Sequence, residues 1–573
     1  MKKFAKKFTF MVLASAVAAT TLVGCSSSEE TTEKPAKESG GTGESKEDTK
    51  EEAAAGPQGT VVFASSEFNG IFSPFFYTTA YDNDILSRVH EGLLSLDPSG
   101  QVVGNLADYT IEEVKEGDVI KNTIYTLTLK EGLTFSDGEP ITSDDVIFSY
   151  KVLSDPTYDG MATFSTLPII GMEEYRTGDA TEIPGIEKVD DRTVKITIEG
   201  IDPAVITKLG IAVAPEHYYG VGFEKGKLEG VKAVNGTPVG AGPYKFEAFE
   251  DNVVTLTANE SYFLGTPKIE KLKYQVVDEA NKLEAVKGET VDISDPQASP
   301  EMVQMVEDAG LHHELVDNPG YGYIGINKER VTDINVRKGL MHLMNRGPAI
   351  EAYYGDLAKV IERPMTTVSW AYPQDAEEYY GYNPEKALEY FTAAGYTNEG
   401  GKLMKDGEQL RVEVGISDIA THPSGPILTQ MKADMESMGA VLEIMDSDGA
   451  VFFDTLNSEG WDMFVAAWGA ATDPDMYQIF HTDGSTARYN TNSPAVDELI
   501  EAARLTNDIE ERKDLYSDAL DLVMEEAVVM PVYQRMNMFV FNPGYVDITS
   551  LPEEMTAYFD HRNDIHNLQA MTK

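Results

Sequence analysis

The chain contains a single cysteine, Cys25, in 573 residues. An intramolecular disulfide is therefore excluded, and a zinc site built from several cysteines is nearly excluded as well. Any fold of this chain must be held by noncovalent packing. Hydrophobic residues make up 42% and aromatic residues 9% of the chain, which is enough for packed cores and too much for wholesale disorder. The length corresponds to three or four domains of roughly 150 residues each.

The composition is strongly acidic. Asp and Glu number 96 against 46 Lys and Arg, so the formal net charge is −50. This balance excludes general nucleic-acid binding through a basic surface, because phosphate contacts need clustered Lys and Arg. It also argues against attachment to anionic lipid through a polybasic face. We expect a solvated, self-repelling surface; long-range attraction of cationic peptides is the alternative.

The N-terminal segment has the organisation of a secretory signal. Four lysines in the first seven residues precede an uncharged, mostly apolar stretch over 8–24. That stretch is shorter than the about 20 residues of a spanning helix. It ends in Leu22-Val23-Gly24-Cys25, which resembles the lipobox of bacterial lipoproteins. The resemblance implies that the signal 1–24 is removed and that the Cys25 thiol carries lipid, palmitate included; an ordinary cleaved signal with a chance cysteine is the alternative.

Residues 26–56 are rich in Ser, Thr, Glu, Lys and Gly and contain no aromatic residue. Such a segment buries too little apolar surface to offset its ordering entropy, so residues 25–56 predict a lipidated cysteine followed by a disordered tether. The rest of the chain has no apolar run of about 18 residues and predicts a water-soluble body. We expect a protein anchored to the outer face of the cytoplasmic membrane of a Gram-positive bacterium.

The first half of the body is rich in strand patterns. Period-two alternation places Tyr125, Leu127 and Leu129 on one face of a strand, and Val194, Ile196 and Ile198 repeat the pattern. Residues 244–258 predict a hairpin with its turn at 250–252. Leu272, Tyr274 and Val276 mark a further strand.

The second half is more helical. Ser493-Pro494 predicts an N-cap followed by proline at the first helical position. Val496, Leu499, Ile500 and Ala503 then recur at helical spacing, and Leu515, Ala519 and Val523 follow a cap at Asn507 or Asp508. Nearer the front, 142–145 resembles a capping box, with Val146, Tyr150 and Leu153 forming a stripe behind it. These faces predict core packing in a mixed α/β fold.

Local motifs give no support for an enzyme. The chain has no G-x-S-x-G elbow and no phosphate-binding G-x-x-x-x-G-K-[ST] loop. His90-Glu91 begins like a zincin helix, but the second histidine of that motif is absent. Paired carboxylates carry little weight in so acidic a chain. We therefore predict no catalytic residue, no cofactor and no metal ligand, although a metal site assembled from distant segments stays open.

One long segment is recognisable. Residues 125–146 read YTLTLKEGLTFSDGEPITSDDV. They resemble the signature Y-T-F-x-L-R-x-G-V-x-F-x-D-G-x-P-x-T-A-x-D-V of the oligopeptide- and dipeptide-binding proteins, the extracytoplasmic solute-binding proteins of peptide and nickel ABC transporters. A strand, a turn at Asp137-Gly138 and a capped helix account for the pattern. This segment is scaffold.

Further segments follow in the order of the family. They are 238–246 (PVGAGPYKF), 324–346 with its Asn327, Arg337 and Arg346, 382–396 with YNPEKA and AGY, 468–474, and 490–500. The resemblance spans about residues 61–541. A single match would be moderate evidence, but an ordered series of matches is strong evidence.

The resemblance implies two lobes around a hinge, with one lobe enlarged by an extra subdomain. Lobe I would comprise 60–100, 235–325 and 530–573, the extra subdomain 101–234, and lobe II 326–529. Two connections between the lobes would let them close over a ligand, which would shift the population toward the closed form. We expect a monomer.

In this family, an extended peptide is held by backbone hydrogen bonds, like an added strand. The first segment that does this corresponds here to 77–81, with Thr78, Thr79 and Tyr81. The second follows the family's tryptophan and includes Trp468, Gly469, Ala471, Asp473 and Asp475. Tyr321 and Tyr323 precede a lobe crossing and are expected to line the cleft or the hinge.

Alternatives remain at these positions. Many peptide binders read W-x-A-D, and that Asp pairs with the peptide α-ammonium, but Ala471 stands there in this chain. Asp473 or Asp475 is the candidate replacement. Asp473-Pro474 also fits a helix N-cap with proline at the first helical position, and Trp468 could be simple core. The nickel binders have a similar segment, so it does not exclude a metal complex.

The function implied is capture of oligopeptides outside the cell and their delivery to an ABC permease, with the chain anchored through Cys25 and no nucleic acid as partner. The alternative is the same fold carrying a nickel complex, haem or an oligosaccharide. A sensory receptor or hydrolase built on this fold is a third possibility.

Overall fold

A computed structural model describes residues 56–571 except 118, 459, 470 and 487. The expected signal 1–24, the lipidated Cys25 and nearly all of the expected tether lie outside the described residues. Residues 55–573 form one compact unit. None of the helices in the described ranges is long and apolar enough to span a bilayer.

A sheet of twelve strands links the elements of this unit. Its order is β19-β18-β20-β13-β21-β11-β1-β10-β9-β8, and β12 and β14 also pair with β21. The strands are β1 (Thr60–Ser65), β8 (Tyr244–Glu250), β9 (Val253–Ala258), β10 (Lys271–Val276), β11 (Ile293–Ser294), β12 (His312–Asp317), β13 (Gly320–Ile326), β14 (Ala358–Lys359), β18 (Arg411–Ser417), β19 (Val441–Ser447), β20 (Met463–Gly469) and β21 (Val529–Phe541).

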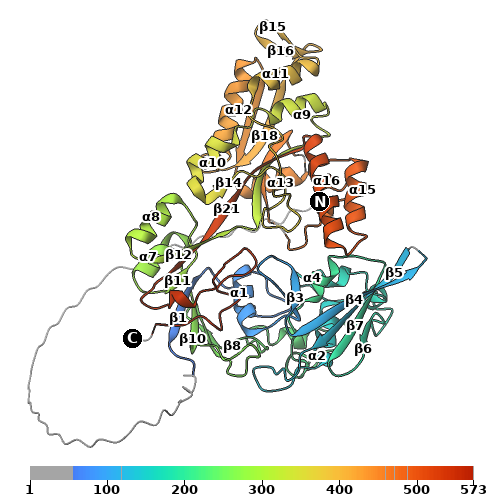
Figure 1. The fold of residues 1–573 in the computed structure, drawn as a ribbon, viewed down its shortest axis with the longest axis vertical. Helices are drawn as coiled ribbons and strands as arrows, with labels where there is room; N and C mark the ends of the chain where they lie inside the picture. Colours follow the sequence, from blue (N-terminus) through green and yellow to red (C-terminus); the bar gives the residue numbers. More distant parts are fainter. Residues whose placement is uncertain (1–55, 118, 459, 470, 487, 572–573) are drawn as a thin grey trace, which may run out of the picture. The chain divides into compact units, whose positions relative to one another are not determined.

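β21 lies in the middle of this sheet and joins its two halves (Figure 1). Its first part, up to Tyr533, pairs antiparallel with β13, and its last part, from Met536, pairs antiparallel with β12. β12 and β13 are consecutive strands joined through residues 318–319. Two segments of chain, β12–β13 and β21, therefore run side by side from one half of the sheet to the other.

The mixed α/β class and the two-lobed architecture predicted above are confirmed by the sheet and by the solved structures reported below. The predicted lobe boundaries at 325/326 and 529/530 stay predictions. In the first segment, β12 gives way to β13 at 318–319, before the predicted boundary at 325/326. In the second segment, β21 changes its partner from β13 to β12 around 534–535, after the predicted boundary at 529/530.

A second sheet, β4-β5-β7-β6, builds the core of the segment predicted as the extra subdomain. The predicted inward faces are confirmed: Tyr125 lies opposite Ile196 and Leu127 opposite Val194, and all four are at most 2% exposed. The elements of this region are β2 (Leu94–Leu96), β3 (Val102–Gly104), β4 (Ala107–Glu116), β5 (Val119–Leu129), β6 (Ile186–Lys188), β7 (Thr193–Glu199), α2 (Ser143–Leu153), α3 (Met172–Thr177), α4 (Val205–Leu209), α5 (Glu216–Tyr219) and α6 (Glu229–Lys232).

The remaining elements are helices and a separate three-stranded sheet, β15-β16-β17. Near its β1 end lie α1 (Ala80–Val89), α7 (Lys282–Lys287) and α8 (Pro300–Asp308) (Figure 1). The later elements are α9 (Ile334–Met341), α10 (Arg346–Tyr354), α11 (Pro384–Ala393), β15 (Thr397–Glu399), β16 (Lys402–Lys405), β17 (Glu408–Gln409), α12 (Gly425–Ser437), α13 (Gly449–Ser458), α14 (Tyr477–Phe480), α15 (Pro494–Ala503) and α16 (Ile509–Glu525).

The predicted helix starts are confirmed. Ser493 is the N-cap of α15 with Pro494 in its first turn. Of the two candidate caps for α16, Asp508 is the one used, because its carboxylate accepts the backbone N–H groups of Glu510 and Glu511. The 244–258 hairpin forms β8 and β9, and the two turn residues at 251 and 252 have the positive φ that a tight turn requires.

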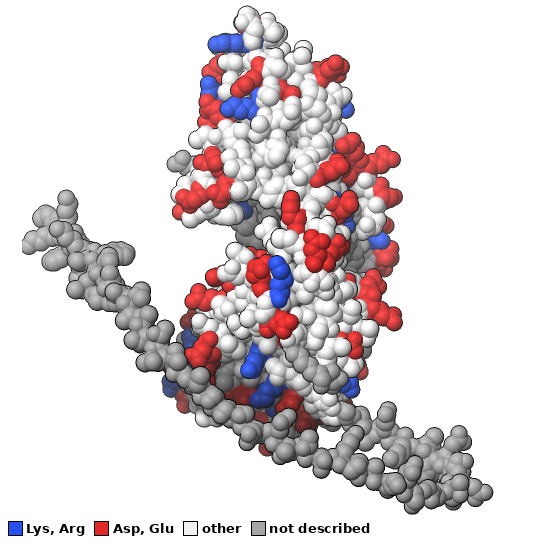
Figure 2. Space-filling model, turned by 90° about the vertical axis from the view of Figure 1, so that its left-hand side faces the viewer, with Lys and Arg blue, Asp and Glu red and all other residues white. Residues whose placement is uncertain are grey.

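On the face that Figure 2 presents, acidic side chains are spread widely rather than gathered in one patch. Figure 2 shows them over much of the face that it presents, with fewer basic side chains between them. This distribution fits the expected solvated, repulsive surface.

Candidate functional site

The first predicted ligand segment lies at the start of α1. The Thr79 hydroxyl accepts the backbone N–H of Asp82 at 3.0 Å and so caps the helix. The Thr78 hydroxyl accepts the side-chain amide of Asn69 at 2.8 Å, which ties the preceding loop to the helix. Tyr81 is 38% exposed. Thr78 is exposed as well and Thr79 is half-buried, so Thr78 and Tyr81 present free surface to a ligand.

The second predicted segment begins at the end of β20, beside β13. In the ladder between β20 and β13, Trp468 pairs with Tyr321 and Gly469 with Gly320. Paired residues of an antiparallel ladder share one face, and the next residue along points to the other face. Trp468, Tyr321 and Tyr323 therefore project from the same face of the sheet, so the structure brings together residues about 145 positions apart in the sequence.

On that face the two tyrosines are core residues. Tyr321 and Tyr323 are 3% and 2% exposed, and Tyr323 packs on Tyr489 with ring centroids 5.6 Å apart. Trp468 is partly buried against the same cluster. These side chains therefore pack in a core on that face of β13 and β20.

The opposite face of β13, β20 and the neighbouring strand β21 lines a cavity. It carries Gly320, Gly322, Ala467 and Gly469, with Tyr533 and Arg535 on the neighbouring strand β21, around a cavity of about 210 Å³. The ring of Tyr533 lies over Gly322, where an added Cβ would stand 2.3 Å from it. A Cβ at Gly469 would meet nothing within 4 Å. Gly320, Gly322 and Gly469 have no side chain, and this leaves the space of the cavity open.

β20 also has a free edge beside this cavity. β18 pairs with β20 only at Met463 and Phe464. From Val465 to Gly469, no described strand pairs with the edge of β20 that faces away from β13. Ala467 and Gly469 are exposed. An unpaired strand edge offers N–H and C=O groups to any extended chain that lies along it.

Arg535 is the cation of this cavity, and sequence reasoning missed it. Its side chain is partly buried, and none of the described carboxylates lies within 4.0 Å of it. The phenols of Tyr533 and Tyr354 lie near its charge, and burial raises the pKa of both, so they stay protonated. Nothing in a strand pattern shows whether an arginine has a carboxylate partner.

Asp473 and Asp475 each face an arginine. The two carboxylate oxygens of Asp473 accept Nη2 of Arg512 at 2.8 and 3.0 Å, and both side chains are nearly buried. Asp475 lies 3.4 Å from Nε of Arg504, and burial raises its pKa while the charge of Arg504 opposes that rise. A ligand ammonium would have to share either carboxylate with its arginine. Ala471, just after β20, is exposed.

The helix-cap interpretation of Asp473-Pro474 is wrong. α14 begins at Tyr477, with Met476 as its N-cap, so Pro474 precedes the helix by three residues. Asp473 instead accepts the backbone N–H of Asp475, and Asp475 accepts that of Tyr477. The pattern failed because the carboxylate of Asp473 serves a distant partner, Arg512, and a local turn.

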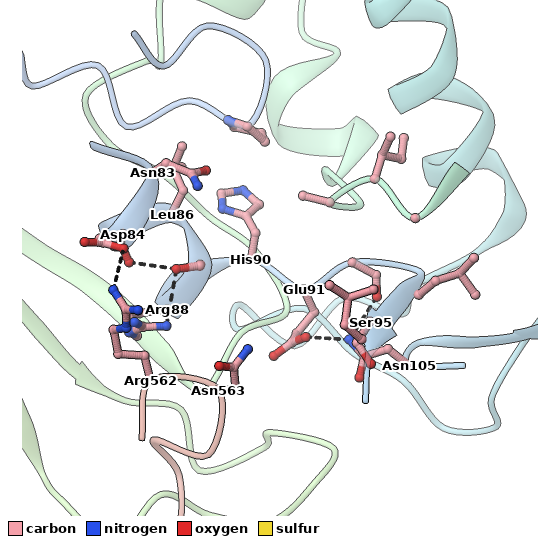
Figure 3. A pocket seen from close by; sticks show the side chains of 18 of the residues that line it. Asn83, Asp84, Leu86, Arg88, His90, Glu91, Ser95, Asn105, Arg562 and Asn563 are labelled. Atoms are coloured by element: carbon pink, nitrogen blue, oxygen red, sulfur yellow. Dashed lines mark hydrogen bonds and ion pairs between the residues drawn. The ribbon is translucent and has the colours of Figure 1, made fainter. Parts of the chain in front are cut away.

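A second cavity, of about 820 Å³, lies between α1 and the segment 557–565 (Figure 3). Polar side chains line much of it, and Figure 3 labels Asn83, Asp84, Arg88, His90, Glu91, Ser95, Asn105, Arg562 and Asn563 among them. His90 and Glu91, which the sequence singled out, thus belong to one polar pocket. Within the described ranges, no group of three or more His, Cys, Asp or Glu could hold a metal ion.

Comparison with known proteins gives one family. The family described as "Bacterial extracellular solute-binding proteins, family 5 Middle" matches residues 108–490. The oligopeptide-binding protein AppA of Bacillus subtilis is 24% identical over 538 residues, covering 90% of this chain and 92% of its own. Heme-binding protein A of Haemophilus influenzae is 25% identical over 461 residues, covering 74% of this chain and 78% of its own.

Solved structures share the fold. The structure of AppA from Bacillus subtilis in complex with a nonapeptide has a TM-score of 0.65 at 20% identity and covers 90% of this chain and 100% of its own. NikZ from Campylobacter jejuni in complex with Ni(L-His) has a TM-score of 0.66 at 21% identity and covers 89% of this chain and 99% of its own. At this identity the likeness shows the fold alone.

The packing around Gly322 and Gly469, which line the cavity between β13, β20 and β21, can be tested directly. We expect Gly322→Ala to lower stability by about 1–3 kcal/mol, because the new methyl group forces the Tyr533 ring out of place. Gly469→Ala is the matched control and should leave the thermal midpoint nearly unchanged, since its methyl group meets open space. Equal midpoints for the two variants would contradict this packing.

The buried His90 predicts acid sensitivity. Burial lowers its pKa to about 4, below the ordinary value of 6.5. Between these values the unfolded chain binds a proton that the folded chain does not, so stability falls as the pH falls, by about 3 kcal/mol in all. Unfolding free energies measured from pH 7 to pH 4 should depend less on pH in His90→Gln. They should keep their slope in His217→Gln, where the side chain is 40% exposed. An unchanged slope in His90→Gln would exclude this origin.

Proposed function

Because the chain belongs to family 5 of the bacterial extracellular solute-binding proteins, which serve ABC transporters and are not enzymes, we propose that its own solute is an oligopeptide that it delivers to an ABC permease. The observation that carries the proposal is the free edge of β20 at residues 465–469, near β13 and β21, which join the two halves of the sheet. An extended peptide can add to such an edge as one more strand.

The side chains around the edge support this mode of binding. Gly469 and Ala467 leave the backbone open to approach, and the hollow beyond them has room for a ligand side chain. Main-chain hydrogen bonds would give affinity that does not depend on the peptide sequence. A broad peptide specificity follows.

Arg535 would add a preference to this site. As a cation without a described carboxylate partner, it would form charge-assisted hydrogen bonds with a ligand carboxylate, either an acidic side chain or the C-terminus. Its charge would locally offset the repulsion that an acidic protein exerts on an acidic ligand.

The anchor of the peptide α-ammonium stays a hypothesis for Asp473 or Asp475. Asp473→Asn is a poor test, because it would leave the buried Arg512 without its carboxylate and destabilise the fold. N-acetylated peptides test the same question on the unaltered protein. Weaker binding of the acetylated form would support an ammonium anchor.

Haem or a nickel complex is the second candidate solute, and the names of two similar proteins favour it: heme-binding protein A and NikZ in complex with Ni(L-His). The strand edge fits these compact ligands less well than it fits a peptide.

We further propose attachment to the outer face of a Gram-positive cytoplasmic membrane through Cys25, with the chain acting as a monomer. Support for the anchor is the Leu22–Cys25 motif. Mass spectrometry of the N-terminal peptide tests it, since a diacylglycerol on Cys25 adds a defined mass.

Thermal unfolding with candidate solutes tests the function. A mixed peptide pool should raise the midpoint by mass action, whereas nickel-histidine and haem should not. The reverse result would replace the peptide with the other solute.

Isothermal titration then tests Arg535. Arg535→Gln should weaken binding of a Glu-containing peptide about tenfold while its Gln counterpart loses less, as expected for one lost charge-assisted hydrogen bond. Arg176→Gln, which removes an exposed arginine of α3, is the control and should bind like the unaltered protein. Equal losses for both peptides would remove Arg535 from ligand recognition.

A further inference from the structure

The cavity beside α1 contains a buried cation of unusual surroundings. Arg88 is 4% exposed. Its Nε donates to the Tyr274 hydroxyl at 3.1 Å and its Nη1 to the Ser87 hydroxyl at 3.2 Å. Both acceptors are neutral, and none of the described carboxylates lies within 4.0 Å of the guanidinium.

The other buried cations of the described chain differ from Arg88 in this respect. Each has a carboxylate within 4.0 Å; they are Lys282, Arg337, Arg346, Arg363 and Arg512. Burying a charge without an opposite charge is costly, which is why buried ions are normally paired. Arg88 therefore has an unfilled preference for an anion.

The cavity also holds a carboxylate that lacks a close cation. Glu91 accepts the Tyr262 hydroxyl at 2.7 Å and the Asn105 amide at 2.6 Å, both neutral donors. Asp84, by contrast, lies 3.9 Å from Arg562, whose guanidinium is also engaged by Asp560 at 2.6 Å. Burial raises the pKa of both Glu91 and Asp84. The charges of Arg562 and Arg88 oppose the rise at Asp84, and the Tyr262 and Asn105 hydrogen bonds together with the charge of Arg88 oppose it at Glu91. These groups face the same space as Arg88 (Figure 3).

We propose that this cavity is a second ligand site that binds a small zwitterion, a free amino acid or a dipeptide, with the ligand carboxylate on Arg88 and its ammonium toward Glu91. A zwitterion supplies both missing charges at once and adds no net charge to the buried site. The volume of about 820 Å³ falls within the ~300–1,000 Å³ of ordinary small-molecule pockets.

The site is separate from the strand edge proposed for peptides. No residue of β13, β20 or β21 lines it. It lies between α1, the segment 557–565 and residues of β2 and 210–212, so its occupancy does not require a peptide on β20. The proposal can fail while the peptide proposal stands, and the reverse holds as well.

Isothermal titration with glycine and glycylglycine tests the proposal on the unaltered protein. Both probes should bind, whereas glycinamide, which lacks the carboxylate, and N-acetylglycine, which lacks the ammonium, should each bind about tenfold more weakly or worse. The three tryptophans of the chain, Trp370, Trp461 and Trp468, do not line the cavity, so tryptophan emission should stay unchanged on binding. No heat at millimolar glycine or glycylglycine would overturn the proposal.

Two substitutions locate the site. Arg88→Gln should weaken both probes about tenfold or more, and Glu91→Gln, which keeps the size of the side chain but removes its charge, should do the same through the ammonium. Arg176→Gln should bind the probes normally. If Arg88→Gln does not fold, as judged from its thermal midpoint, Glu91→Gln decides alone. Undiminished binding in Glu91→Gln, or in a folded Arg88→Gln, would overturn the proposal.

Discussion

The pairing of β21 with both β12 and β13 is the constraint on which the rest of the structure depends. One strand of 13 residues pairs with strands of both halves of a twelve-stranded sheet, with β13 in one half and with β11 and β12 in the other. Because β12 and β13 are consecutive in the chain, two connections join the halves, and a bend at residues 318–319 and 534–535 would move one half against the other. A two-lobed fold needs such a connection.

The proposed ligand site follows from this arrangement. β13 and β20 carry aromatic side chains on one face, where Tyr321 and Tyr323 form part of a core. On the other face they carry Gly320, Gly322, Ala467 and Gly469, beside the Tyr533 and Arg535 side chains of β21. Rigid support from behind and open backbone in front suit main-chain recognition of a peptide. Arg535 adds a local positive charge in a chain of net charge −50, so ligand charge can be selected at one point without changing the overall field.

The sequence predicted features that depend on local periodicity and capping. The buried faces of Tyr125 and Leu127, the Ser493 cap and the 251–252 turn are examples, because their causes lie within a few residues. Through resemblance to a family, it also predicted that Trp468 begins a ligand-binding segment and that Tyr321 and Tyr323 line the cleft or the hinge; the structure places Trp468 and Tyr321 opposite each other in one ladder. The cap at Asp473 was wrong because its partner Arg512 is 39 residues away. The charge environments of Arg88 and Arg535 could not be predicted, since the lack of a nearby carboxylate is a property of the folded chain.

The central claim is that a peptide adds as a strand along the free edge of β20. Hydrogen–deuterium exchange followed by mass spectrometry measures this directly, because amides that gain a partner exchange more slowly. With a saturating peptide, the segment containing residues 465–469 should become protected, while the β4–β5 hairpin, which lies in another sheet, should exchange as before. Peptide binding with unchanged exchange at 465–469 would contradict the account.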